Sequence, residues 1–261
     1  MPQDNEIVAL APRGDGVTAA GRHAPGLLPG DFDGEAPRAP RAPPICRWYG
    51  ACGGCVAQHM PAELYKDWKR ASVVKALADA GVAAEVGALV DAHGEGRRRA
   101  TFHARTTPEG IVEVGFMRAG AFALRLAQTH ATFAVDVDAA AIAALRRAAG
   151  RTPRGVDAVV RNLFRDPIPA AELARFDAVL FDPPRAGAEA QTRQIAATDV
   201  GKVIAISCNV ETFARDAKIL QDGGYQCDDV TPIDQFRFSA HVEIFAAFRR
   251  VKAKKRRSLL G

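Results

Sequence analysis

The chain has 261 residues, 48% of them hydrophobic and 25% charged, and its formal net charge is +5. It is long and apolar enough to bury a core in one or two domains, so we expect a globular protein. No apolar run approaches the roughly 20 residues that span a bilayer, and no charged-then-apolar signal opens the chain. We therefore expect a cytoplasmic protein with no membrane partner.

The cysteines and the distribution of charge indicate what kind of site and what kind of partner the protein has. Five cysteines, an odd number with three of them clustered, favour a metal or catalytic use over a disulfide scaffold. Positive charge is concentrated at residues 97–99 and 249–257. Such runs favour a polyanionic partner, although a solvated face is the commoner reason for them. No feature of the sequence indicates a protein partner.

The N-terminal part of the chain predicts small, irregular elements. Residues 1–44 are rich in Gly and Pro, which predicts short strands of a small β-barrel followed by a Pro/Ala linker. Cys46, Cys52 and Cys55 come next, at the spacing C-x5-C-x2-C. Residues 61–81 then carry apolar side chains at helical spacing and end at a glycine, so they predict an amphipathic helix.

From residue 122 the pattern changes to helices that alternate with buried strands. Apolar strands that end in polar residues, each followed by a helix, predict an α/β protein with a doubly wound, mostly parallel sheet, whose functional residues lie at the C-terminal strand ends. The expected helices cover residues 122–130, 138–150, 189–197 and 210–224, and the expected strands cover residues 131–137, 156–162, 176–184, 201–209, 225–236 and 241–250.

Three strand ends carry residues suited to chemistry. Asp182 precedes two prolines, which present its carboxylate on a stiff loop. Cys208 lies between a strand and a helix N-terminus, a place that favours a lowered thiol pKa, although a buried structural cysteine is an equal alternative. Glu243 lies in an apolar segment, where it is either a desolvated base or a solvent-facing residue of an edge strand.

Four motifs in this order resemble the RNA (uracil-5-)-methyltransferase family, in particular the branch that makes 5-methyluridine in 23S ribosomal RNA. They are CxxxxxCGGCxxQH at 46–59, FDPPRAGA at 181–188, SCNxxTFARD at 207–216 and DQFxxSxHVE at 234–243. The Gly-rich N-terminus resembles the TRAM barrel of that family. The resemblance implies a Rossmann-like methyltransferase sheet, S-adenosyl-L-methionine as methyl donor and ribosomal RNA as partner.

The resemblance also implies roles for particular residues. Cys208 matches the thiolate that adds to C6 of uracil, and Glu243 matches the base that removes the C5 proton. Asp182 matches a residue that lines the pocket for the methyl donor and the uracil, which must be single-stranded or extruded. Asp136, at the end of an expected strand, matches the acid that holds the cofactor ribose.

The cysteine motif implies a metal site. Cys46, Cys52 and Cys55 match three of the four thiolates that hold a [4Fe-4S] cluster in the family, and the fourth is missing. Zinc held by these three thiolates and His59 is the alternative, because zinc accepts Cys3His sites. We favour the iron–sulfur cluster, since His59 matches the Gln-His pair of the family motif rather than a ligand.

The chain resembles an internally deleted member of this family. Family members are longer and place the fourth cysteine, a central β-rich segment and a glycine-rich cofactor loop after a segment like GFMRAG (115–120). In this chain Gly120 and Phe122 keep the register of that loop, so both are candidate cofactor contacts. Residues 111–116 either replace the lost strand or stay with the cluster segment, and we take the first as our hypothesis. Arg118 departs from the loop pattern, because it stands at a glycine position where a side chain obstructs the cofactor.

Two functions remain open at this point. The first is methylation of uridine C5 in 23S ribosomal RNA through a covalent adduct with Cys208. The second is an RNA-binding, catalytically impaired remnant that lacks the main cofactor loop. Methylation of an exocyclic amine fits less well, because it leaves Cys208 and Glu243 without roles. We expect three units, namely a TRAM-like segment and linker at 1–44, a cluster and RNA-contacting segment at 45–120, and a methyltransferase domain at 121–261.

Overall fold

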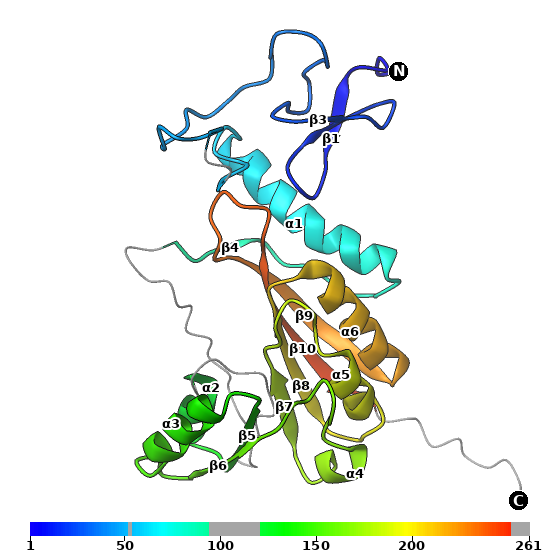
Figure 1. Ribbon diagram of the computed structural model, residues 1–261. Helices are drawn as coiled ribbons and strands as arrows, with labels where there is room; N and C mark the ends of the chain where they lie inside the picture. The colour runs from blue at the N-terminus through cyan, green and yellow to red at the C-terminus, as the bar shows by residue number, and fades with distance from the viewer. Residues whose placement is uncertain (52–53, 94–120, 252–261) are drawn as a thin grey trace, which may run out of the picture.

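The structure is a computed structural model that describes residues 1–51, 54–93 and 121–251. Figure 1 shows an elongated molecule: a small N-terminal sheet lies above helix α1 (Ala62–Asp79), the main sheet lies below that helix, and a second small sheet lies at the lower end. None of the helices in these ranges is long and apolar enough to cross a membrane.

The main sheet has five strands in the order β4-β9-β10-β8-β7. β7 and β8 run parallel, whereas β10 runs antiparallel to both of its neighbours, β8 and β9. The residues of β7 and β8 are buried except for Lys202, which explains their nearly continuous apolar sequence. The strands are β4 (Val90–Asp91), β7 (Ala178–Phe181), β8 (Lys202–Ser207), β9 (Tyr225–Asp234) and β10 (Glu243–Arg250).

Helices α5 and α6 pack against each other beside this sheet, and α1 packs on α6 and β9. The buried faces of these helices and of the strands form the largest hydrophobic core, with Leu220, Val230 and Phe248 fully buried. The helices on this side are α4 (Ala170–Leu173), α5 (Glu189–Ala196) and α6 (Val210–Asp222).

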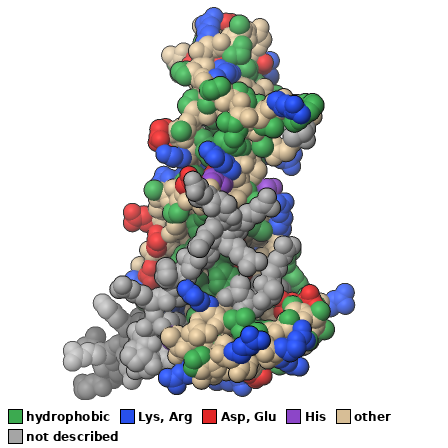
Figure 2. All heavy atoms as spheres, turned by 90° about the vertical axis from the view of Figure 1, so that its left-hand side faces the viewer, with side chains coloured by type: hydrophobic (Ala, Val, Ile, Leu, Met, Phe, Trp, Pro, Cys, Tyr) green, Lys and Arg blue, Asp and Glu red, His purple; other side chains and the backbone are tan. Residues whose placement is uncertain are grey.

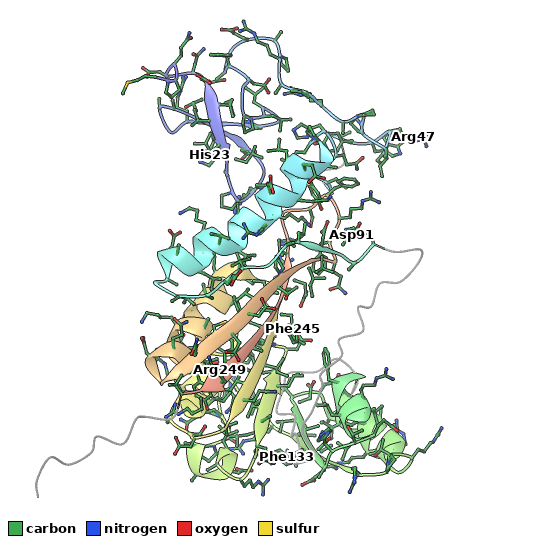
Figure 3. All side chains as sticks on the ribbon, turned by 180° about the vertical axis from the view of Figure 1, so that it is seen from behind. His23, Arg47, Asp91, Phe133, Phe245 and Arg249 are labelled. Carbon is green, nitrogen blue, oxygen red and sulfur yellow. The ribbon has the colours of Figure 1, made fainter. Side chains whose placement is uncertain are left out.

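A second, two-stranded sheet consists of the parallel strands β5 (Thr132–Asp136) and β6 (Val156–Val160), which pack with α2 (Ala121–Leu126) and α3 (Ala139–Ala149). It shares the hydrophobic core of the main sheet, because Phe133 of β5 stacks on Phe176 with ring centroids 5.6 Å apart. Figure 3 labels Phe133 and Phe245, which lie on the two sheets. The two sheets therefore form one packed body.

The α/β class is confirmed, and each helix and strand expected between residues 122 and 250 has a counterpart in the structure. Within the described residues the expected single sheet consists of two sheets, with β5 and β7 each at an edge. The candidate replacement strand, residues 111–116, lies outside the described residues, so its place in the sheet stays a hypothesis.

The N-terminal sheet consists of β1 (Ile7–Leu10), β2 (Gly16–Thr18) and β3 (His23–Ala24), all antiparallel. It is joined to α1 by a small core that includes Leu28 and Trp68. Trp68 is 5% exposed, and its indole Nε1 donates a hydrogen bond of 2.8 Å to the carbonyl oxygen of Ala11. The same helix packs on the main sheet, so α1 connects the two ends of the molecule.

Replacement of Trp68 by Phe tests this connection. Trp68→Phe keeps the aromatic ring but leaves the Ala11 carbonyl without its indole donor, and we expect the free energy of unfolding to fall by about 1–2 kcal/mol. Urea denaturation followed by far-ultraviolet circular dichroism measures the change. Trp48 is 57% exposed, so Trp48→Phe is the matched control and should change stability by less than about 0.5 kcal/mol. Equal losses in the two variants would contradict the assignment.

Candidate active site

Three segments that are distant in sequence meet where β7 and β8 end and β10 begins. Asp182 follows the last residue of β7, Cys208 follows the last residue of β8, and Glu243 is the first residue of β10. In the antiparallel ladder of β10 and β8, Ile244 pairs with Ser207, so Glu243 and Cys208 are the next residues along the two strands. The structure thus brings these three predicted site residues together.

Burial and charge set the protonation of this group. Burial, and to a smaller extent the nearby carboxylate of Asp182, raise the pKa of the Glu243 carboxyl to about 7. Burial also raises the pKa of the Cys208 thiol; Glu243 and Asp182 act in the same direction, whereas Arg185 opposes them. Arg185 is exposed and was not among the predicted site residues. Its place directly after the two prolines of FDPPR is the signal that identifies it.

The expectation of a lowered thiol pKa at Cys208 is wrong, because the pKa of this thiol is raised. The local arrangement is as expected: Asn209 caps α6, and its Oδ1 accepts hydrogen bonds from the backbone N–H groups of Glu211 and Thr212, at 2.9 and 3.2 Å. The helix N-terminus therefore lies beside the thiol. Burial and two carboxylates outweigh it, because both disfavour a second negative charge in the same partly buried site.

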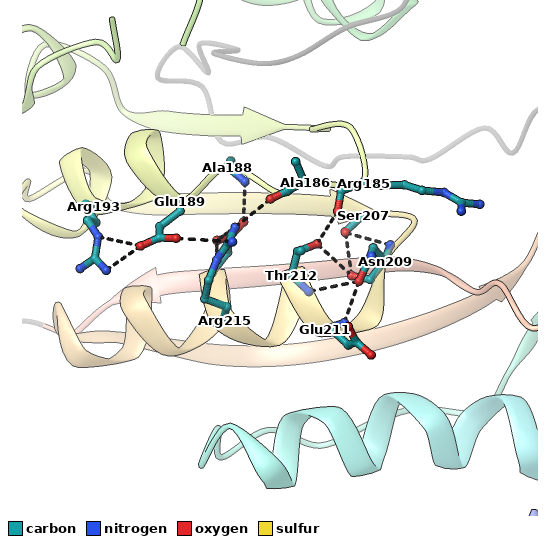
Figure 4. A network of polar contacts seen from close by, with 11 residues as sticks. Arg185, Ala186, Ala188, Glu189, Arg193, Ser207, Asn209, Glu211, Thr212 and Arg215 are labelled. Atoms are coloured by element: carbon teal, nitrogen blue, oxygen red, sulfur yellow. Dashed lines mark hydrogen bonds and ion pairs between the residues drawn. The ribbon is translucent and has the colours of Figure 1, made fainter. Parts of the chain in front are cut away.

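One face of α6 holds the loop that carries Asp182 and Arg185 (Figure 4). Thr212 Oγ1 donates to the carbonyl oxygen of Arg185 at 3.1 Å, and Arg215 Nη2 donates to that of Ala186 at 3.1 Å. Asp216 Oδ2 accepts a hydrogen bond of 2.7 Å from the backbone N–H of Ala188. Residues 212, 215 and 216 share a helix face because they are three and four positions apart.

These contacts explain why the FDPPRAGA and SCNxxTFARD motifs occur together: the second motif binds the backbone of the first. Gly187 fits this close approach, since its φ is +76° and an added Cβ would lie 2.8 Å from Asp216 Oδ2. Thr212, Arg215 and Asp216 were not among the predicted site residues. Their presence in a motif beside Cys208 was the available signal.

Two of the predicted cofactor residues, Asp136 and Phe122, lie on or near the second sheet, whereas Asp182 follows β7 of the main sheet. Asp136 ends β5, and its Oδ1 accepts a hydrogen bond of 2.8 Å from the backbone N–H of Asp138. Phe122 of α2 is partly buried and contacts both the core of the second sheet and a cluster formed by Leu180, Ile204 and Ile206. Gly120 lies outside the described residues. The cofactor roles of these residues stay predictions.

The predicted metal ligands are described only in part. Cys46 and Cys55 are partly exposed, and Cys52 lies outside the described residues. Among the residues that the structure describes, no group of three or more His, Cys, Asp or Glu side chains could hold a metal ion. His59, the ligand of the alternative zinc site, is buried with its Nδ1 against the hydroxyl of Tyr49, and burial lowers its pKa. Neither a cluster nor zinc is supported by this geometry.

The raised pKa of Glu243 predicts a pH-dependent stability. The unfolded carboxyl ionises near pH 4.5 but the folded one near 7, so folding disfavours the charge, and the cost grows between these values and is constant above them. We expect Glu243→Gln to raise the free energy of unfolding by about 2–3 kcal/mol at pH 8 and to have little effect at pH 4. Urea unfolding at several pH values measures this. A gain that is independent of pH would contradict the burial of an ionisable group.

The chain is similar to known RNA methyltransferases over part of its length. Residues 158–250 match the family model of the tRNA (uracil-5-)-methyltransferases. An uncharacterized RNA methyltransferase of Mesorhizobium japonicum is 52% identical over 143 residues, which cover 54% of this chain and 34% of that protein. One from Caulobacter vibrioides is 44% identical over 133 residues, covering 50% of this chain and 32% of that protein.

Among solved structures, the tRNA (uracil-54, C5)-methyltransferase of Pyrococcus abyssi in complex with S-adenosyl-L-homocysteine is 28% identical, with a TM-score of 0.46; the match covers 53% of this chain and 34% of that one. The chain spans about a third of the length of the curated relatives it matches. The resemblance to the RNA (uracil-5-)-methyltransferase family is thus confirmed, and residues 158–250 are the part of the chain that matches its family model.

Proposed function

We propose that this protein methylates C5 of a uridine in RNA, with S-adenosyl-L-methionine as methyl donor, Cys208 as nucleophile and Glu243 as base. The proposal rests on one observation: Cys208, Glu243 and Asp182 lie together at the adjoining ends of β8, β10 and β7. A thiol and a carboxyl with a pKa of about 7 are the two groups that this chemistry needs, since one adds to the pyrimidine and the other accepts a proton.

The proposed reaction consists of adduct formation, methyl transfer and elimination. Cys208 loses its thiol proton to solvent, and its sulfur forms a bond to C6 of uracil, which turns the ring into an enolate that is nucleophilic at C5. The enolate carbon C5 attacks the methyl group that bound S-adenosyl-L-methionine would supply; the bond between that methyl and the sulfonium sulfur would break, and S-adenosyl-L-homocysteine would leave. Glu243 as carboxylate then takes the C5 proton, the bond between sulfur and C6 breaks, and the C5–C6 double bond is restored. Arg185 favours the thiolate form of Cys208, which counteracts the effect of the two carboxylates.

Asp136, at the end of β5 in the second sheet, is suited to bind the ribose of a nucleoside cofactor. Asp136 ends a parallel strand of the second sheet, and an acid at this place binds a ribose hydroxyl in dinucleotide folds. Phe122 lies between the two sheets and could contact the same ligand from α2. These features support the assignment of both residues to the donor site, with Gly120 as a further candidate.

The RNA substrate is supported by charge as well as by family. Figure 2 shows Lys and Arg side chains spread along the length of the face that carries β4 and α2. Asp and Glu side chains lie on the same face, and the net charge of +5 favours the binding of a polyanion. We further propose 23S ribosomal RNA as the substrate and a [4Fe-4S] cluster on Cys46, Cys52 and Cys55, both from the sequence motifs alone.

A second function, an RNA-binding remnant, is favoured by the departure of the sequence from the family's cofactor loop, where Arg118 stands at a glycine position. The described residues form two sheets, with β5 and β7 each at an edge. A protein of this kind could bind RNA through its basic surface without transferring a methyl group. Binding of the methyl donor distinguishes the two functions, because only the enzyme requires it.

Substitution of the two reacting residues tests the proposed chemistry. We expect Cys208→Ala to lower methyl transfer to unmodified ribosomal RNA by more than ~10³-fold, because no adduct forms. Glu243→Gln should instead accumulate a covalent protein–RNA complex, since the C5 proton cannot be removed. Labelled methyl donor and denaturing gel electrophoresis measure both results.

The control for this experiment is a cysteine away from the site. Cys227 is buried on β9, and burial raises its thiol pKa to about 12, so Cys227→Ala should retain activity. Transfer that survives Cys208→Ala would exclude the thiolate mechanism. The absence of both transfer and donor binding in the unaltered protein would favour the RNA-binding remnant.

A further inference from the structure

The loop of residues 235–242, which joins β9 to β10, leads directly into Glu243. We propose that Lys69 and Asp234 are positioning residues of the catalytic centre: their buried ion pair fixes this loop from helix α1 and thereby sets the place of Glu243 beside Cys208. The inference rests on the proposed function, because it is that function which gives Glu243 a catalytic task. We call residues 235–242 the base loop.

The ammonium group of Lys69 binds backbone carbonyls near both ends of the base loop. Its side chain is 1% exposed, and that of its partner Asp234 is 3% exposed. Lys69 Nζ donates to Asp234 Oδ1 and also to the carbonyl oxygens of Phe236 and His241, each at 2.9 Å. An ammonium has three donors, so all of them are used. The two carbonyls lie near opposite ends of the base loop, so the contacts hold both ends at one point.

Asp234 is held from two further directions. The hydroxyl of Tyr65 donates to Asp234 Oδ2 at 2.6 Å, and His93 Nε2 lies 2.9 Å from the same oxygen. Burial alone would raise the pKa of Asp234, but the groups around it, Lys69 first, hold that pKa below its usual range. The carboxylate is therefore charged at neutral pH and remains paired with Lys69.

The middle of the base loop is fixed by a second set of contacts. Phe238 has a φ of +60°, a left-handed conformation that is uncommon for a residue other than glycine. Its backbone N–H donates to the Tyr65 hydroxyl at 2.8 Å, and its carbonyl oxygen accepts from the N–H groups of Val56 and Ala57, at 2.8 and 3.2 Å. Such a conformation persists only where the surroundings determine it, and it is commonest near functional sites.

These contacts are better explained by positioning than by stability. A buried ion pair is weak evidence for stability, because apolar residues of similar volume often serve as well. Here the ion pair binds the backbone of the one segment that connects Asp234 to Glu243, and Val242 next to Glu243 is 1% exposed. Without Lys69, Asp234 keeps its bond from Tyr65 but loses its ammonium partner, and the carbonyls of Phe236 and His241 lose a donor, so the base loop and the Glu243 that follows it are held less firmly.

The test measures the surroundings of Cys208 without relying on methyl transfer. The charged groups that face the thiol are Glu243 of β10 and, from the loop after β7, Asp182 and Arg185. Because Glu243 raises the pKa of the thiol, its displacement should increase the thiolate fraction. Alkylation of Cys208 by iodoacetamide, followed as a function of pH by mass spectrometry of the peptide that contains it, reports this fraction separately from the other cysteines.

We expect Lys69→Met to increase the alkylation rate of Cys208 at pH 7.5 by about three- to tenfold, which corresponds to a fall of up to about one pKa unit. Lys69→Met leaves Asp234 buried without its ammonium partner, so we include the variant Lys69→Met with Asp234→Asn, which removes both charges. It should fold and show the same increase. Lys75→Met is the matched control, since Lys75 lies on the same helix with a side chain 65% exposed.

Two results would overturn the inference. One is an unchanged alkylation profile in the folded double variant, with folding established by thermal unfolding. The other is an equal change in Lys75→Met. If the unaltered protein transfers methyl groups, the double variant should also lower kcat at least about tenfold with little change in the KM for RNA. An inactive unaltered protein would count against the proposed function only, because the alkylation result does not depend on activity.

Discussion

The pairing of β10 between β8 and β9 is the constraint on which the site depends. Because β10 is antiparallel to β8, the beginning of one strand meets the end of the other, and Glu243 and Cys208 become neighbours. Phe248 and the other buried residues of β10 lie in the main core, so this register is determined by hydrophobic packing. The geometry of the candidate site is thus a consequence of how the sheet is assembled.

Two helices, α6 and α1, bind the loops that carry or lead into the candidate site residues. On one side α6 binds the backbone of the loop with Asp182 and Arg185, through Thr212, Arg215 and Asp216 (Figure 4). On the other side α1 contacts the loop that leads into Glu243. Both helices act through backbone carbonyl or N–H groups, which fixes the path of each loop rather than a single side chain. A site built in this way needs little rearrangement when its ligands bind.

Electrostatics in this site follow from burial more than from local structure. A helix N-terminus lies beside Cys208, yet the thiol pKa is raised, because desolvation and two nearby carboxylates disfavour a further negative charge. The same desolvation raises the pKa of Glu243 to about 7. At neutral pH the Glu243 carboxyl therefore lies close to its point of ionisation.

The sequence by itself determined the elements from residue 122 onward, the α/β class and the family resemblance, because apolar periodicity, caps and motif residues are local signals. It also indicated Cys208 and Glu243. Only the tertiary structure decided the direction of the thiol pKa, the contact between the two motifs and the buried pair of Lys69 and Asp234. A lysine on an amphipathic helix is expected to face solvent, and the partner that changes this is 165 positions away in sequence. Burial of charge depends on neighbours from distant segments, and no local pattern records them.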